Sequence, residues 1–304
     1  MSRLDVIFES VRARTDPGLV TFVTAGDPDL DRSADILRVL DSAGADVLEV
    51  GVPFSDPLAD GPVIQRASER ALRTGTTLSR TMSMVEQVRS SVQAGIVLFT
   101  YANPVVRMGQ KVFLERAASA GVDGVLILDL PIEEAEEFQT TSKDVGIDPI
   151  FLLSPTTSDD RIRRAAELGR GFLYGISRLG VTGATDTISD GAEELVGRIR
   201  GLTDMPIAVG FGISRPEHVA AVGRWADAAV VGSGLVDVIA RASSAELLGD
   251  VERYVRWLRG DSSGVCDMTE GERAAEPESA TVANRLDGFR RRIDELDEQI
   301  VRLV

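Results

Sequence analysis

Residues 46–62 read DVLEVGVPFSDPLADGP and join an apolar run to a polar loop. The run from Val47 to Val52 is rich in β-branched residues, which predicts a strand, and it contains one carboxylate, Glu49. A strand buried on both faces disfavours a charge, so Glu49 needs a specific role or partner. A second carboxylate, Asp60, follows eleven residues later in a loop rich in proline, aspartate and glycine. Burial would raise the pKa of Glu49 while hydrogen bonds keep Asp60 ionised, a division that suits acid and base catalysis.

A plainer interpretation of the same stretch is open at this point. Asp56 and Asp60 are common turn formers, and Glu49 could be paired to an arginine. The position of both carboxylates in the fold decides between the two interpretations.

A strand followed by a helix recurs along the chain. We expect strands near residues 18–25, 46–50, 95–101, 124–129, 149–153, 171–176, 206–210 and 228–231. Helices are expected over residues 30–43, 63–72, 78–92, 110–120, 133–145, 159–168, 190–201, 215–224 and 234–258, after an amphipathic segment at 1–14. Such alternation predicts a parallel sheet, because parallel neighbours need crossover connections.

Eight such units over about 260 residues match an α/β fold of the closed (β/α)8 TIM barrel type with an N-terminal extra helix. The competing open, doubly wound sheet would need a glycine fingerprint after its first strand, and Thr24–Pro28 has none. In a barrel, Glu49, Asp60 and Tyr174 would all lie at the carboxyl ends of strands, where barrel enzymes place their chemistry.

Composition changes after the barrel. Residues 1–259 form the predicted barrel, and residues 260–280 are small and acidic, which predicts a disordered linker. Residues 281–304 carry apolar side chains at alternating steps of three and four, which predicts an amphipathic helix. The chain stops at Val304 in the middle of that pattern.

The composition also excludes several classes of protein. A net charge of −15 argues against nucleic acid or an anionic membrane as a partner, and there is no apolar run long enough for a membrane span. The single cysteine, Cys266, rules out an intramolecular disulfide and favours a cytoplasmic location. The only histidine is His218, expected at the start of a surface helix, so no metal site is expected. Lys111 and Lys143 lie in predicted helices, which leaves no strand-end lysine for a Schiff base.

Three glycine-bearing loops follow the last three predicted strands, at residues 180–183, 210–214 and 232–234. Glycine lets backbone N–H groups approach an anion, and the loops after the last two strands of a barrel often hold phosphate. Each loop alone could be a tight turn, but together they predict a phosphorylated substrate. Proton transfer by carboxylates is then the chemistry that the residue types leave available.

Four motifs together resemble the tryptophan synthase α subunit family. They are LEVGVPFSDPLADGPVIQRA at 48–67, YANP at 101–104, YGISR at 174–178 leading to GVTG, and GFGIS at 210–214. The likeness covers about residues 1–259. It implies a lyase that cleaves indole-3-glycerol phosphate to indole and glyceraldehyde 3-phosphate in tryptophan biosynthesis. No cofactor is implied in this chain; pyridoxal phosphate is expected in a β subunit, in an α2β2 assembly.

The resemblance also implies roles for individual residues. Glu49 would be the proton shuttle, Asp60 would hydrogen-bond the indole N–H, and Tyr174 would help to position Glu49. The implied substrate-binding residues are Phe22, Leu126, Thr182, Gly183, Phe211, Gly212, Gly232 and Ser233, and those facing the β subunit are Pro53, Asp56 and Asn103. One departure is Gly234, where the family usually has alanine.

The C-terminal segment resembles a second family. RLDGFRRRIDELDEQIVRLV, at residues 285–304, is similar to the first helix of the all-helical chorismate mutases, with Arg290 at an active-site position. A coiled-coil helix is the alternative, and the abrupt end favours a truncated mutase domain. We expect the segment to be dispensable for indole formation.

Two other functions stay open on the sequence. Another phosphate-binding barrel, such as a phosphosugar isomerase, would share the glycine loops. A catalytically idle chain that only activates a β subunit would keep the interface. The loop Pro53–Pro62 shows no obvious anchor, which predicts weak activity without a partner that orders it.

Overall fold

The computed structural model describes residues 1–176, 190–210 and 212–261, and within them the strands match the sequence prediction. The strands are β1 (Gly18–Thr24), β2 (Val47–Gly51), β3 (Gly95–Thr100), β4 (Gly124–Ile127), β5 (Asp148–Ile150), β6 (Leu152–Leu153), β7 (Leu173–Ile176), β8 (Ile207–Gly210) and β9 (Ala228–Val231). The residues belong to one compact unit, Met1–Gly264.

Every strand pair in this sheet is parallel, in the order β5-β4-β3-β2-β1-β9-β8-β7-β6. The two ends of that order, β5 and β6, are consecutive in the chain and are separated only by Phe151. They are two halves of one strand, the first paired with β4 and the second with β7. The sheet therefore closes on itself as an eight-stranded barrel, as predicted.

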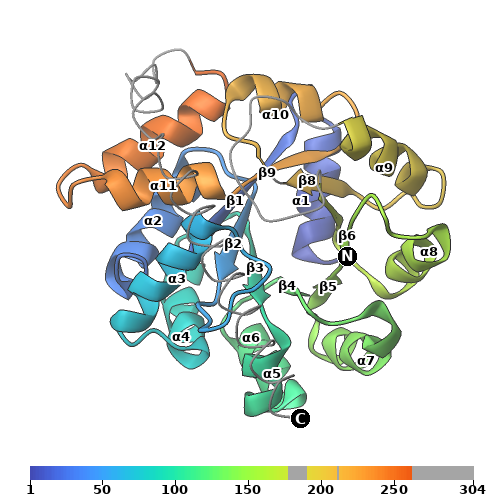
Figure 1. Cartoon of the computed structure of the whole chain (residues 1–304), viewed down its shortest axis with the longest axis horizontal. Helices are drawn as coiled ribbons and strands as arrows, with labels where there is room; N and C mark the ends of the chain where they lie inside the picture. The colour runs from blue at the N-terminus through green and yellow to red at the C-terminus, as the bar shows by residue number, and fades with distance from the viewer. Residues whose placement is uncertain (177–189, 211, 262–304) are drawn as a thin grey trace, which may run out of the picture. The chain divides into compact units, whose positions relative to one another are not determined.

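Helices surround the barrel (Figure 1). They are α1 (Arg3–Arg12), α2 (Leu30–Ser42), α3 (Pro62–Arg73), α4 (Leu78–Arg89), α5 (Ala102–Met108), α6 (Gln110–Ser119), the 3-10 turn η1 (Ile132–Glu134), α7 (Glu136–Val145), α8 (Asp159–Leu168), α9 (Asp190–Arg200), α10 (Pro216–Val222), α11 (Ser233–Arg241) and α12 (Leu247–Leu258). None of the described helices is long and apolar enough to cross a membrane.

The predicted N-terminal helix, α1, closes the amino-terminal end of the barrel. Its Leu4 and Phe8 are fully buried, and Phe8 packs on Phe172 with ring centroids 5.2 Å apart. Glycines at the first positions of β3 and β4 make room for Leu4. A Cβ on Gly95 would lie 2.5 Å from Leu4 Cδ2, and one on Gly124 would lie 3.0 Å from Leu4 Cδ1.

Three aspartates at this amino-terminal end have structural roles. Three aspartates that precede strands each accept a hydrogen bond from a neighbouring strand's backbone N–H: Asp46 from Leu19 (2.8 Å), Asp123 from Ile96 (2.8 Å) and Asp227 from Ile207 (2.7 Å). Each also pairs with arginines: Asp46 with Arg14 and Arg259, Asp123 with Arg3 and Arg89, and Asp227 with Arg12 and Arg200. Charge at this end therefore holds the barrel together.

Three details differ from the sequence prediction. The helix expected over 234–258 is two helices, because Ala242 is extended and Ser243 Oγ donates to Glu246 Oε2 at the start of the second one. The short helix α5 was not predicted. His218 does lie on a helix, but its side chain is buried and its Nδ1 accepts the N–H of Ser214 (3.3 Å).

Candidate active site

Glu49 lies in the middle of β2 with its side chain inside the barrel. Its register partners are Phe22 on β1 and Val97 on β3, so apolar groups flank it on both sides. The residue is 1% exposed, and within the described part of the chain its Oε1 has no hydrogen-bond partner. Burial alone raises the pKa of Glu49 from 4.5 to about 8. Near neutral pH, Glu49 is therefore a protonated acid, and no arginine among the described residues pairs with it, contrary to the plainer interpretation.

Asp60 lies at the end of the loop between β2 and α3 and is only 7% exposed. The Tyr101 hydroxyl donates to Asp60 Oδ2 at 3.0 Å and accepts the backbone N–H of Ala59 at 3.2 Å. Burial raises the pKa of Asp60 to about 6, and the Tyr101 hydrogen bond opposes that rise. Asp60 is consequently ionised under conditions where Glu49 is still protonated.

The loop that carries Asp60 is anchored, which corrects the expectation that Pro53–Pro62 is free. Besides the Tyr101 contacts, the Gln65 side-chain amide on α3 donates to the carbonyls of Asp60 (2.9 Å) and Pro57 (3.3 Å). These anchors lie on two different elements, so the loop geometry is defined within the chain itself.

Tyr174 lies on β7, buried with its side chain inside the barrel. Its pKa is well above the usual range because of burial, with further contributions from the charges of Glu49 and Asp60. It therefore remains a neutral phenol. Gly210 on β8 gives the ring its space, since a Cβ there would lie 2.5 Å from the Tyr174 hydroxyl oxygen.

One pocket brings most of the predicted site residues together. Its described lining comprises Phe22, Glu49, Asp60, Ile64, Phe99, Tyr174, Gly212, Val230, Gly232 and Ser233. Leu126 instead is fully buried in the core inside the barrel and does not line the pocket. Thr182, Gly183 and Phe211 lie outside the described residues.

Sequence reasoning missed Ile64, Phe99 and Val230. For Phe99 a signal existed, because it follows the inward-facing Val97 by two residues on the same strand. Its ring meets Phe22 edge to face, with centroids 5.4 Å apart and an interplanar angle of 79°. The two rings form an apolar wall beside the carboxylates, as a flat aromatic substrate would require.

The glycine end of the pocket is built on a helix start. Gly232 precedes α11, whose first residue is Ser233, and Gly212 has a positive φ of 82° that favours glycine. Free N–H groups at a helix N-terminus attract anions. The departure at Gly234 has a local cause, because a Cβ there would clash with the hydroxyl of Tyr254, which donates to the Ser214 carbonyl at 3.0 Å.

The residues expected to face a partner lie around Tyr101. Pro53 is buried, whereas Asp56 and Asn103 are exposed. Two apolar side chains that sequence reasoning missed are also exposed there, Leu58 on the Asp60 loop (88%) and Val106 on α5 (73%).

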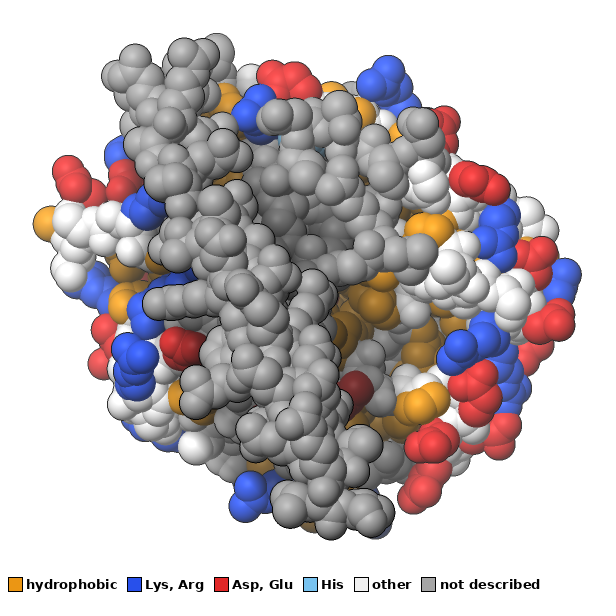
Figure 2. Space-filling model, in the orientation of Figure 1, with side chains coloured by type: hydrophobic (Ala, Val, Ile, Leu, Met, Phe, Trp, Pro, Cys, Tyr) orange, Lys and Arg blue, Asp and Glu red, His pale blue; other side chains and the backbone are white. Residues whose placement is uncertain are grey.

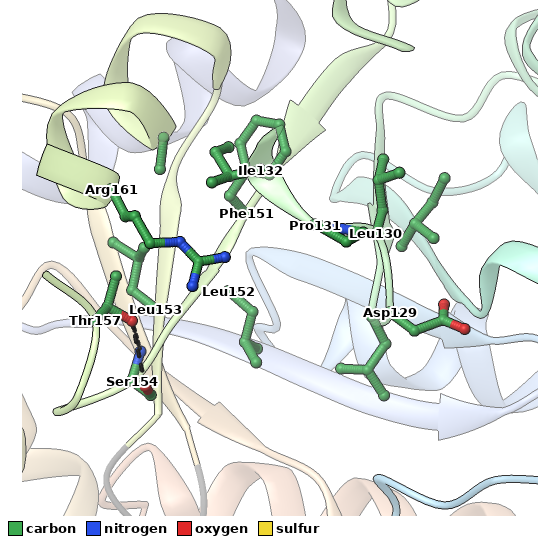
Figure 3. Close-up of a pocket in the computed structure, with 13 residues that line it drawn as sticks. Asp129, Leu130, Pro131, Ile132, Phe151, Leu152, Leu153, Ser154, Thr157 and Arg161 are labelled. Carbon is green, nitrogen blue, oxygen red and sulfur yellow. Dashed lines mark hydrogen bonds between the residues drawn. The ribbon is translucent and has the colours of Figure 1, made fainter. Parts of the chain in front are cut away.

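A larger groove of about 360 Å3 lies beside the ends of β4 and β6. Figure 2 shows apolar side chains in a hollow right of centre, near those strands, and Figure 3 shows the groove's residues. Its charged groups are already engaged: Asp129 Oδ1 accepts the Ala102 N–H (2.6 Å) and Arg161 pairs with Glu133 (3.0 Å). The unpaired carboxylate lies in the smaller pocket, which is therefore the candidate active site.

The fold and the pocket define a class of protein. A buried protonated glutamate, an ionised aspartate, an aromatic wall and an anion-attracting helix start meet at the carboxyl ends of the barrel strands. The class is a (β/α)8-barrel protein whose pocket suits acid and base chemistry by carboxylates. Among the described residues, no group of histidine, cysteine and carboxylate side chains could hold a metal ion.

Comparison with known proteins identifies the family. A sequence model of the family "Tryptophan synthase alpha chain" matches residues 8–256. The tryptophan synthase alpha chain of Methylococcus capsulatus is 51% identical over 243 residues, covering 80% of this chain and 91% of its own. The tryptophan synthase alpha chain of Geobacter sulfurreducens is 47% identical over 259 residues, which cover 85% of this chain and 98% of its own. A structure of Mycobacterium tuberculosis tryptophan synthase superimposes with a TM-score of 0.79 at 36% identity, covering 86% of this chain and 98% of that one.

The chain belongs to the tryptophan synthase alpha chain family. It cleaves indole-3-glycerol phosphate in tryptophan biosynthesis, which confirms the predicted lyase over the isomerase and the idle partner. The alpha chain carries no cofactor, since pyridoxal phosphate belongs to the beta chain. The family match ends at residue 256 and does not support the predicted likeness to chorismate mutase; Arg290 lies outside the described residues.

Proposed function

We propose that Glu49 is the acid and then the base of the lyase reaction, with Asp60 stabilising the charge that forms between the two steps. The observation that carries this proposal is Glu49 itself, which is buried and protonated, has an Oε1 with no hydrogen-bond partner among the described residues, and shares its pocket with an ionised carboxylate. A group with a pKa near the working pH can both give and take a proton.

The proposed steps balance as follows. The Glu49 carboxylic acid protonates C3 of the indole ring, which places a positive charge on the ring nitrogen. Asp60 accepts the indole N–H and stabilises that charge. The Glu49 carboxylate then takes the proton of the glycerol hydroxyl next to the ring. A carbonyl forms, the bond between C3 and the side chain breaks, and its electron pair returns to the ring. Indole and the aldehyde leave, and Glu49 is protonated again.

The remaining site residues bind and position the substrate in this proposal. Tyr174 packs beside Glu49 as a neutral phenol. Phe22 lies against the indole ring, and the resemblance implies the same contact for Phe211; Leu126 packs in the core inside the barrel. The backbone N–H groups of Gly212, Gly232 and Ser233 hold the phosphate, and the resemblance implies the same role for Thr182 and Gly183.

The direct test is to mix the purified chain with indole-3-glycerol phosphate and measure indole. We expect indole and glyceraldehyde 3-phosphate in equal amounts. No indole, with or without a beta chain, would overturn the proposal.

We also propose a beta-chain docking surface made of Pro53, Asp56 and Asn103, with Leu58 and Val106 added from the structure, in an α2β2 assembly. Large exposed apolar side chains on one face are a common mark of an interface. The support is that Leu58 and Val106 are exposed on the two elements that adjoin Tyr101.

Leu58→Ser should weaken binding of the beta chain by about tenfold or more, because it removes the most exposed apolar side chain of this surface. Activity of the isolated chain should stay unchanged. The matched control is Val6→Ser, an exposed apolar residue on α1 at the other end of the barrel. Calorimetric titration with the beta chain measures both, and equal affinities for the two variants would contradict the proposed surface.

We propose that residues 261–304 are not needed for the lyase reaction. The relatives reach 91–98% of their own length within the matched region, and the family match ends at residue 256. Deleting residues 261–304 should leave the indole-forming rate and the melting temperature within error, and should reduce any self-association in sedimentation. A large loss of lyase activity would contradict this division.

We also propose a cytoplasmic location, which the single cysteine suggests.

A further inference from the structure

Tyr101 is the last residue before α5 and directly follows β3. It is buried, and its ring lies 5.0 Å from that of Phe54 between centroids, at an interplanar angle of 31°. The hydroxyl reaches the Asp60 loop at two points, the Ala59 N–H and Asp60 Oδ2. Neither hydrogen bond belongs to β3 or to α5; both fix the position of the Asp60 loop.

The direction of these two hydrogen bonds is fixed by the atoms available. A phenol hydroxyl has one proton to donate and lone pairs that accept. Because the Ala59 N–H can only donate, the Tyr101 oxygen accepts this hydrogen bond with a lone pair. The single Tyr101 proton is then free for the ionised Asp60 carboxylate, 3.0 Å away. Hydrogen bonds arranged in such a chain polarise one another, and one that ends on a charged acceptor is among the stronger kinds.

The groups that surround Asp60 explain why this one hydrogen bond matters for its ionisation. The titratable side chains that share its pocket in the described part of the chain are Glu49 from β2 and Tyr174 from β7. Tyr101 comes from the end of β3, and the charge of Asp129 acts on Tyr101. None of the four is a cation, so hydrogen bonding is what favours the ionised form of Asp60 against burial. Burial raises the Tyr101 pKa above its usual range, which keeps the phenol protonated as a donor.

We propose that Tyr101 is a positioning residue of this lyase: its hydroxyl holds the Asp60 carboxylate in place and in its ionised form. The inference rests on the proposed role of Asp60. Tyr101 does not line the pocket, so it acts through Asp60 and not on the substrate.

Tyr101→Phe tests the proposal because it removes the hydroxyl and keeps the ring that packs on Phe54. The rate kcat should fall about tenfold, since a misplaced charge stabilises the indolium less well, while KM changes less than twofold. The acidic limb of the profile of kcat/KM against pH should move upward by about one pH unit, because Asp60 loses a hydrogen bond to its charged form. A 13C NMR titration of the Asp60 carboxyl should show the same shift without depending on activity.

The matched control is Ser142→Ala on α7. Ser142 is also buried and also loses one hydroxyl hydrogen bond, to the Phe138 carbonyl (2.6 Å), far from the pocket. This variant should melt earlier and keep the wild-type pH profile. Tyr101→Phe could instead behave like Ser142→Ala, with a lower melting temperature, the wild-type acidic limb and the wild-type Asp60 titration. Tyr101 would then have only a structural role, and the inference would be wrong. If the wild type itself makes no indole, the proposed function fails instead.

Discussion

Glu49→Gln is expected to abolish indole formation and, at the same time, to stabilise the protein. The amide keeps the shape of the acid but cannot give or take a proton. Loss of a general acid or base typically costs about 10²–10⁴-fold in rate. Glu49 serves two proton transfers in the proposed reaction, so the loss should lie at the upper end of that range or beyond it. Binding of the substrate should change little, because the pocket keeps its volume.

The gain in stability follows from the pKa of the buried acid. In the unfolded chain Glu49 ionises around pH 4.5, whereas in the folded chain it does so at about 8. Between these values folding requires proton uptake by Glu49, so the wild type loses stability as the pH rises through this window. At pH 7 the free energy of unfolding is lower by about 3 kcal/mol than it would be with a group that does not titrate. Glutamine does not titrate, so the variant should avoid the loss.

Thermal unfolding at several pH values measures this effect. The melting temperature of Glu49→Gln should exceed that of the wild type most at pH 8, and the two should converge near pH 4. Glu252→Gln, on the exposed side of α12, is the matched control and should change neither rate nor stability. Near-normal turnover by Glu49→Gln would move the chemistry to another group, with Asp60 the first to test.

The barrel and the carboxylate pair were predictable because their signals are local in the sequence. Short apolar runs followed by amphipathic helices specify parallel strands, and an acid inside such a run is conspicuous. Glu49 could therefore be selected as a candidate without knowing which residues lie next to it in the fold. The structure adds that apolar residues flank Glu49 on both neighbouring strands and that no cation among the described residues pairs with it, which the sequence left open.

The support around Asp60 was not predictable, because it comes from residues far away in the chain. Asp60 and Tyr101 are 41 residues apart, and only the register of β2 beside β3 brings the loop and the tyrosine together. The same holds for Leu126, whose inward position was foreseeable but whose absence from the pocket lining was not. Sequence periodicity assigns a side chain to a face of the sheet and says little about its height in the barrel.

The two ends of the barrel use carboxylates in opposite ways. At the amino-terminal end, Asp46, Asp123 and Asp227 are each paired with arginine and bonded to backbone N–H groups. At the carboxyl-terminal end, burial raises the pKa values of Glu49 and Asp60, and no cation among the described residues pairs with either of them. Stability and catalysis therefore depend on separate sets of acids, and substitutions at the two ends should separate in experiment.

Asp60→Asn is the substitution that tests this separation. It should lower kcat by about 10²–10³-fold, because the amide cannot supply negative charge opposite the indolium nitrogen. The amide oxygen can still accept the Tyr101 hydrogen bond, so the loop should keep its position. The control Asp123→Asn makes the same chemical change at the amino-terminal end. It should lower the melting temperature, since it weakens the pairing with Arg89, and leave kcat unchanged.

The pH profile distinguishes the roles of the two acids. In the wild type, kcat/KM should rise as Asp60 ionises at about pH 6 and fall as Glu49 ionises at about pH 8. In Asp60→Asn the acidic limb should vanish from the residual activity while the alkaline limb stays, because Glu49 still has to begin each turnover protonated. If the alkaline limb vanished and the acidic limb stayed, Asp60 would be the proton donor and Glu49 the charged partner, which would reverse the proposed mechanism.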